Sequence, residues 1–128
     1  MTPIRVGGRR ALGGAGERAA ERLLRRAGLV VLARNWRGSG GEIDLAALEG
    51  ETIVFVEVKS RAEAFPAEYP AIRAAQRRRI VRAARAFRGR YGVEHHPYRF
   101  DLVTVEGDPD EPGAVVWHRR QPRVQELA

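Results

Sequence analysis

The sequence predicts a single α/β domain in which a central mixed β-sheet is flanked by helices. The chain has 128 residues, the ordinary size of one domain, and 44% of them are hydrophobic, which is enough for one core. Two segments repeat their apolar residues at helical spacing, and the segments between and after them alternate or are rich in β-branched residues, as strands are. The predicted order along the chain is α-β-β-β-α-β-β, without repeats or internal linkers.

The first helix is predicted over residues 16–27, where apolar side chains recur at three- and four-residue spacing. Glu17 lies in its early turns and Arg25 and Arg26 lie near its end, which is the charge order that the helix dipole favours. Gly28 follows as the expected C-cap.

Three strands are predicted next. Residues 29–33 form a short apolar run, and residues 42–48 alternate in polarity, which places Glu42 and Asp44 on the same face. Residues 52–59 are almost continuously apolar and β-branched, as expected for a central strand that is covered on both faces.

The second half of the chain is predicted to supply one more helix and two more strands. Residues 61–70 contain two prolines and are expected to form a crossover loop. Residues 71–88 follow as a helix whose apolar side chains form one stripe. The remaining strands are predicted at 98–105 and 114–117, separated by a cluster of Gly, Pro and Asp.

The two ends of the chain lack such patterns. We expect a flexible arm over residues 1–14, the folded domain over 15–118, and a polar, frayed tail over 119–128. No apolar segment approaches the length that spans a bilayer and no signal peptide is evident, so a cytoplasmic protein without a membrane partner is expected. The absence of cysteine excludes disulfides, thiolate zinc sites and a cysteine nucleophile.

The net charge of +7 favours a polyanionic partner such as nucleic acid. An equally good explanation is biased codon usage, because 22 of the 23 basic residues are arginine and Lys59 is the only lysine. Charge alone therefore leaves nucleic-acid binding open.

Three ionisable side chains converge on the predicted hairpin of residues 42–59. Its turn lies near Gly50, so strand pairing brings Asp44 opposite or diagonal to Glu57 on the neighbouring strand. Lys59 follows two residues later and shares the face of Glu57, since side chains alternate along a strand. Two carboxylates and an ammonium in a sheet core are costly unless they pair with one another or bind a metal.

That cost has two interpretations. Two close carboxylates repel each other, and a hard cation such as Mg²⁺ relieves the repulsion, polarises a phosphate oxygen and activates water. Lys59 would then orient the water or stabilise charge on the phosphoryl group. The alternative is a buried salt bridge between Lys59 and one of the carboxylates, with no chemistry.

The hairpin also carries a known signature. Gly-Glu-Ile-Asp-Leu at 41–45, followed by Val-Phe-Val-Glu-Val-Lys at 54–59, resembles the D-x12-E-x-K pattern of the PD-(D/E)XK nucleases. More narrowly, the chain is similar to the uncharacterised bacterial YraN family from about Gly13 to Val105. The other matching stretches are Gly16-Glu17, Ala33-Arg34-Asn35-Trp36-Arg37, Gln76-Arg77-Arg78 and Arg99-Phe100-Asp101-Leu102-Val103.

The resemblance implies a restriction-endonuclease-like αβββαβ core, similar in fold and motifs to archaeal Holliday-junction resolvases. It implies that Asp44 and Glu57 bind Mg²⁺ or Mn²⁺, that Lys59 is the catalytic lysine, and that Glu17 is a further ligand or general base. The resemblance supplies no established substrate; the activity that we expect is phosphodiester hydrolysis in DNA, branched or single-stranded, with DNA favoured over RNA. The rival hypotheses are a nucleic-acid-binding module without turnover and a purely structural or interaction protein.

Two positions depart from the family pattern. Ala75 stands where a lysine often precedes the Gln-Arg-Arg of the second helix, and the segment from Trp117 to Pro122 differs from the usual ending. A phosphate contact made by that lysine in relatives would be lost here or taken over by a nearby arginine. The sequence leaves a homodimer open, as in nucleases that act on symmetric junctions.

Four basic residues and one glutamine are further candidates for contacts with nucleic acid. Arg78, Arg82 and Arg85 align on one face of the second helix, where they would track phosphates or simply meet solvent. Gln76 lies on the apolar stripe of that helix, either to reach the metal site or phosphate or to cap a backbone group. Arg37 lies in a predicted Gly-rich loop over 35–41.

Two other side chains are given structural roles. Trp36, in the same predicted loop, is interpreted as a core anchor, with stacking on a base as the alternative. Asp101 lies between Phe100 and Leu102 on a predicted strand, and we expect it to pair with an arginine rather than to take part in catalysis.

Overall fold

The computed structural model describes residue 4 and residues 14–66 and 72–128, so most of the predicted arm lies outside the described residues. The helices and strands are α1 (Ala15–Arg26), β1 (Val30–Gly38), β2 (Gly41–Glu49), β3 (Thr52–Arg61), α2 (Ala74–Arg90), β4 (Tyr98–Glu106), β5 (Val115–His118) and α3 (Pro122–Gln125). The predicted α/β class is therefore confirmed, and so is the αβββαβ order of its core.

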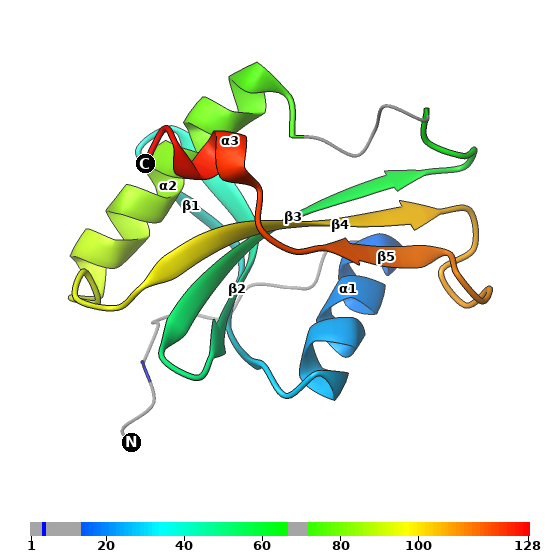
Figure 1. The fold of residues 1–128 in the computed structure, drawn as a ribbon, viewed down its shortest axis with the longest axis horizontal. Helices are drawn as coiled ribbons and strands as arrows, with labels where there is room; N and C mark the ends of the chain where they lie inside the picture. The colour runs from blue at the N-terminus through cyan, green and yellow to red at the C-terminus, as the bar shows by residue number, and fades with distance from the viewer. Residues whose placement is uncertain (1–3, 5–13, 67–71) are drawn as a thin grey trace.

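One mixed sheet holds the five strands in the order β1-β2-β3-β4-β5. Neighbouring strands are antiparallel except β3 and β4, which run parallel from the pair Ile53 and Tyr98 to the pair Arg61 and Glu106. Parallel neighbours need a crossover connection, and α2 lies in it. Figure 1 shows α1 and α2 on opposite faces of this sheet.

The apolar run of β3 is explained by its position between two cores. Phe55 points to the α2 side, where it packs with Phe87 and Phe100, while Val54 and Val56 point to the α1 side. All five side chains are buried. The prediction of a strand covered on both faces is thus correct for residues 53–56, which are buried on both sides of the sheet, whereas Ser60 and Arg61 at the end of β3 are exposed.

The predicted loop over 35–41 is wrong. β1 continues through this segment to Gly38, and Trp36 packs in the core while its Nε1 donates a hydrogen bond to the Tyr91 hydroxyl at 3.0 Å. The turn itself is confined to Ser39 and Gly40, both at positive φ, as expected for a two-residue hairpin. The preferred interpretation of Trp36 as a core anchor is confirmed.

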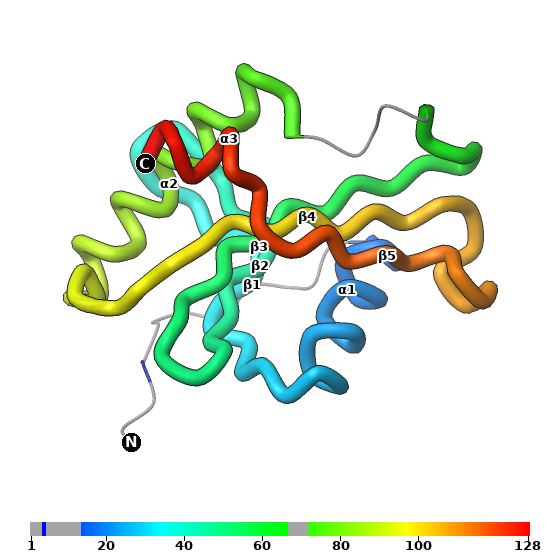
Figure 2. The backbone as a smooth tube through the Cα atoms, in the orientation of Figure 1, coloured from blue at the N-terminus to red at the C-terminus, as the bar shows by residue number. Residues whose placement is uncertain are grey.

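The expectation of a frayed C-terminal tail is also wrong. α3 forms in this segment, Val124 is 1% exposed within the core on the α2 side, and the Gln121 N–H donates to the Phe100 carbonyl at 2.7 Å. Figure 2 traces the chain from β5 back across β4 to α3, which lies beside α2. Only a single buried apolar residue anchors the segment, which is why its mainly polar sequence suggested disorder.

No helix among the described residues is long and apolar enough to span a membrane.

Candidate active site

The pairing of β2 with β3 sets Asp44 against Glu57. The ladder runs from Glu49 and Thr52 to Leu45 and Val56, and one further step along the same register reaches Asp44 and Glu57. There the backbone pairing stops, and the Asp44 carboxylate accepts a hydrogen bond from the Val58 N–H at 2.8 Å instead. The strands therefore separate at the point where the two carboxyls meet.

Lys59 lies next to this pair on the same face of β3. Its Nζ is 3.3 Å from the Glu57 Oε1, and the two side chains are 25% and 13% exposed, respectively. The ion pair that the sequence suggested is thus formed, but Lys59 is not sealed beneath other side chains, since it also lines an open cavity described below. The structure brings together the three residues of the predicted D-x12-E-x-K constellation.

A cavity of about 150 Å³ opens above the two carboxyls. Its lining comes from β2, β3 and α2, namely Glu42, Asp44, Glu57, Gln76, Arg79 and Ile80. The Gln76 Oε1 is buried, and no hydrogen bond to it is found among the described residues. This amide oxygen is therefore free to accept a hydrogen bond or to bind a cation.

Gly41 permits the close approach of α2 to this cavity. A Cβ atom at this position would lie 2.0 Å from the Arg79 backbone carbonyl oxygen, so any larger residue would push the helix away from β2. Glycine at the start of β2 thereby brings the first turns of α2 over Asp44.

The electrostatics of the pair match its geometry. Burial raises the pKa of Asp44 to about 7, and the Glu57 carboxylate adds to the rise while the Val58 N–H opposes it. Burial also raises the pKa of Glu57, against the attraction of the Lys59 ammonium. One lysine therefore does not compensate two buried carboxyls, and the site favours a further positive charge, either a proton or a cation.

A different buried carboxylate, Glu21 on α1, has the opposite character. Arg34 donates to both of its oxygens at 2.6 and 2.8 Å, and Arg25 adds a third bond at 2.9 Å. These guanidinium groups hold the pKa of Glu21 below its ordinary value. Glu21 is a completed ion-pair site, whereas the Asp44 and Glu57 pair is not.

The predicted fourth member, Glu17, lies in the first turn of α1 and does not line the cavity. Among residues 14–66 and 72–128, no group of three His, Cys, Asp or Glu side chains is arranged to hold a metal ion. Two carboxylates with an amide oxygen nonetheless fit Mg²⁺, which usually takes one or two protein carboxylates and completes its shell with water and substrate phosphate. The role of Glu17 stays a prediction.

The cavity contains two charged residues that the sequence reasoning did not select. Glu42 shares a strand face with Asp44, so the alternation of β2 carried a signal for it. Arg79 had no such signal, because its place depends on how α2 crosses the sheet. For Gln76, the alternative of reaching the site agrees with its position in the cavity lining.

The other predicted basic contacts lie apart from the cavity. Arg78, Arg82 and Arg85 are exposed on α2, and Arg85 donates to the carbonyls of the last two residues at 3.2 Å each. Arg37 is exposed at the edge of the sheet, with its Nε 3.5 Å from the Glu42 Oε2. None of the four lines the acidic cavity.

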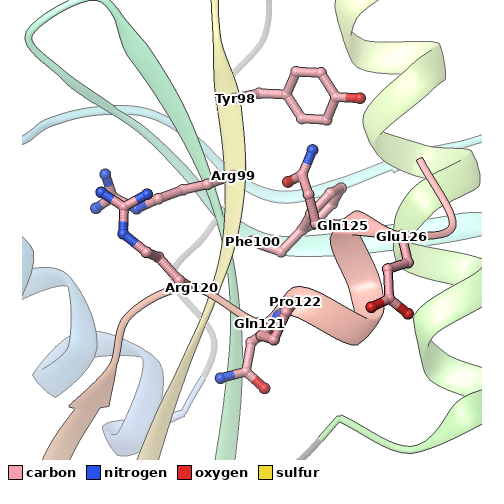
Figure 3. Close-up of a pocket in the computed structure, with 8 residues that line it drawn as sticks. All are labelled: Tyr98, Arg99, Phe100, Arg120, Gln121, Pro122, Gln125 and Glu126. Atoms are coloured by element: carbon pink, nitrogen blue, oxygen red, sulfur yellow. The ribbon is translucent and has the colours of Figure 1, made fainter.

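Asp101 has the structural role that the sequence suggested. It is fully buried and accepts hydrogen bonds from the Arg99 guanidinium, the Trp117 Nε1 and the Arg120 N–H. Beside it, β4 and the C-terminal segment enclose a cavity of about 420 Å³, with Arg99 and Tyr98 directed to opposite sides of the strand (Figure 3). The predicted site residues do not line this cavity.

Comparison with known proteins gives one consistent result. The model of the Uncharacterised protein family UPF0102 matches residues 16–105. A UPF0102 protein of Symbiobacterium thermophilum is 45% identical over 102 residues, which are 79% of this chain and 86% of that protein. One from Burkholderia pseudomallei is 43% identical over 119 residues, covering 91% of this chain and 78% of the relative. One from Nitratidesulfovibrio vulgaris is 44% identical over 101 residues, covering 78% and 75%.

Proposed function

The chain belongs to the uncharacterised protein family UPF0102, the YraN family that its motifs resemble, and from its site we propose a metal-dependent endonuclease that hydrolyses phosphodiester bonds in DNA. Branched or single-stranded DNA is the proposed substrate. One observation carries the proposal: Asp44 and Glu57 meet in a cavity that one lysine does not neutralise. Such an arrangement costs stability and is therefore typical of a functional site.

Asp44, Glu57 and the Gln76 Oε1 would hold Mg²⁺ or Mn²⁺, because all three offer oxygen atoms at one cavity. We propose Glu17 as a further ligand or general base on the basis of the family motif alone. When bound, the metal would polarise a phosphate oxygen and lower the pKa of a coordinated water.

Asp44 and Lys59 have distinct roles in the proposed reaction. Asp44 is held by the Val58 N–H, so its carboxylate is fixed relative to the backbone of β3. Lys59 donates from the rim, where its ammonium can contact the phosphate and stabilise the charge that develops during hydrolysis. A compact ammonium and a planar guanidinium are not interchangeable in such a role, and lysine occurs at this position alone in the chain.

A nucleic-acid-binding module without turnover is the second candidate, and the net charge of +7 favours it. Such a module would bind DNA with a steep salt dependence but would not depend on the Asp44 carboxylate. The cytoplasmic location expected from the sequence stays a prediction.

The test is a cleavage assay on single-stranded, duplex, forked and four-way-junction DNA with Mg²⁺, Mn²⁺ or EDTA. The wild type should cleave at least one form with metal, and Asp44→Asn and Lys59→Ala should each lose about 10²-fold or more in rate. Asp110→Asn is the matched control, since Asp110 is exposed in a turn. DNA binding without cleavage of any form would replace the nuclease with the binding module.

A further inference from the structure

A second cavity, of about 350 Å³, adjoins the acidic one and shares Gln76 with it. Its lining comes from the end of β3, the following loop and the start of α2, namely Lys59, Ser60, Arg61, Phe65, Pro66, Arg73 and Gln76. Among these described residues three carry a positive charge and none is acidic. The two neighbouring cavities therefore have opposite electrostatic character.

The start of α2 adds to the positive side. Arg73 is the N-cap residue, no side chain caps the helix there, and its first turn contains no acidic residue. The first N–H groups of the helix, which have no acceptor within the helix itself, and the positive end of the helix dipole lie where Arg73 and Gln76 line the cavity. A phosphate group would gain from the helix terminus and the basic side chains together.

The cavity also has an aromatic wall. The Arg61 guanidinium carbon lies 5.5 Å from the centre of the Phe65 ring, and the Phe65 N–H donates to the Glu106 Oε1 at 3.0 Å. The loop residue that carries the ring is therefore tied to the end of β4. Aromatic rings and guanidinium planes are the surfaces on which unstacked nucleobases bind.

We infer that this cavity binds one unpaired nucleotide next to the phosphate that lies at Asp44 and Glu57. The phosphate of this nucleotide contacts Arg61 and Arg73, and its base lies against Phe65. The assignment rests on the proposed function for the position of the cleaved phosphate. It narrows the substrate to strands with at least one unpaired base at the site, because a base that is stacked within a duplex cannot enter a cavity of this size.

Fluorescence anisotropy in EDTA tests the inference without cleavage, using a labelled single strand and a blunt duplex of equal length. The wild type should prefer the single strand. Phe65→Leu should weaken its binding about 5- to 100-fold and leave the duplex unchanged, whereas Phe65→Tyr should retain it. Arg61→Gln and Arg73→Gln should each reduce the slope of the logarithm of DNA affinity against the logarithm of salt concentration by about 0.7. Arg26→Gln, at an exposed position on α1, is the control and should keep the slope of the wild type.

Two outcomes overturn the inference while the folded state is verified by circular dichroism. One is equal affinity of the wild type for both DNA forms with no effect of Phe65→Leu, and the other is a loss of DNA affinity that is confined to the arginine variants.

The outcome for the proposed function can be told apart from the outcome for this inference. If the wild type cleaves nothing with Mg²⁺ or Mn²⁺ but Phe65→Leu loses single-strand binding, the nucleotide site stands and the nuclease does not. If the wild type cleaves DNA and Phe65→Leu cleaves and binds like it, the nuclease stands and the nucleotide site does not.

Discussion

Replacing Asp44 with asparagine is expected to stabilise the metal-free protein. The carboxyl is buried opposite Glu57, and Lys59 lies 3.3 Å from Glu57. An asparagine at this position can still accept the Val58 N–H and can donate its amide hydrogens to Glu57. The substitution therefore removes a repulsive charge while it keeps the hydrogen bond that orders the strand end.

The size of the effect follows from the pKa of Asp44, which rises from an ordinary 3.8 to about 7. A pKa difference of one corresponds to about 1.36 kcal/mol, so the ionised carboxylate destabilises the native state by at most about 4 kcal/mol. Because relaxation of the site returns part of this, we expect Asp44→Asn to add about 1–3 kcal/mol to the free energy of unfolding at about pH 8.

The sign of the pH dependence is fixed by the direction of this shift. The native state holds the Asp44 proton more tightly than the unfolded chain, so the stability of the wild type falls as pH rises from 3.8 to about 7. The advantage of the variant should therefore be roughly a third of its full size at about pH 5 and complete at about pH 8.

Urea unfolding followed by tryptophan fluorescence measures both quantities in EDTA, with Asp110→Asn as the matched exposed control. Adding Mg²⁺ at 100 times its dissociation constant should then stabilise the wild type by about 2.7 kcal/mol and the Asp44 variant by less. A variant that is less stable than the wild type at about pH 8, or a gain that is equal at both pH values, would refute the reasoning, since Asp44 would then be a structural partner.

Three further predictions concern the surrounding structure. Asp101→Ala should cost about 3–5 kcal/mol in urea unfolding, because the donors on Arg99, Trp117 and Arg120 lose their shared buried acceptor, and Arg99 keeps only Glu49 among the described residues. A loss below about 1 kcal/mol would contradict this. Gly41→Ala should lower the free energy of unfolding by about 1–3 kcal/mol, since its Cβ would lie 2.0 Å from the Arg79 carbonyl oxygen, and an unchanged melting temperature would argue against that contact. Lys59→Arg should lower the rate of DNA cleavage about 10²-fold while DNA affinity measured by anisotropy stays within about twofold, and full activity would remove the need for an ammonium.

Much of the fold could be predicted because its strongest patterns are local. The unbroken apolar run of β3 required a strand with two covered faces, and the alternation in β2 placed Asp44 on one side. The hairpin turn at Gly50 then set the register that brings Asp44 to Glu57. Each step uses only neighbours in sequence, so it needed no knowledge of how the helices pack.

The errors arose where tertiary contacts decide the structure. The segment at Trp36 is rich in residues that favour turns, yet Trp36 packs against Phe87 of α2 and against Tyr91, the C-cap residue of that helix, and is thereby held in β1. Arg79 joined the site only because α2 crosses β2 closely at Gly41. Such crossings depend on residues far apart in the chain, and a single sequence contains no direct signal for them.

The end of the β2 and β3 ladder explains why the fold and the site belong together. β2 still pairs with β1 as far as Gly41, and β3 still pairs with β4 as far as Arg61, but beyond Leu45 and Val56 the two central strands no longer pair with each other. The Val58 N–H donates to the Asp44 carboxylate, whereas in a continued ladder it would donate to a backbone carbonyl of β2. A stabilising ladder bond is thus exchanged for a buried carboxylate with a raised pKa. A purely structural acid would have been paired as Glu21 is with Arg34, and this contrast supports the proposal that the pair of carboxyls binds a cation.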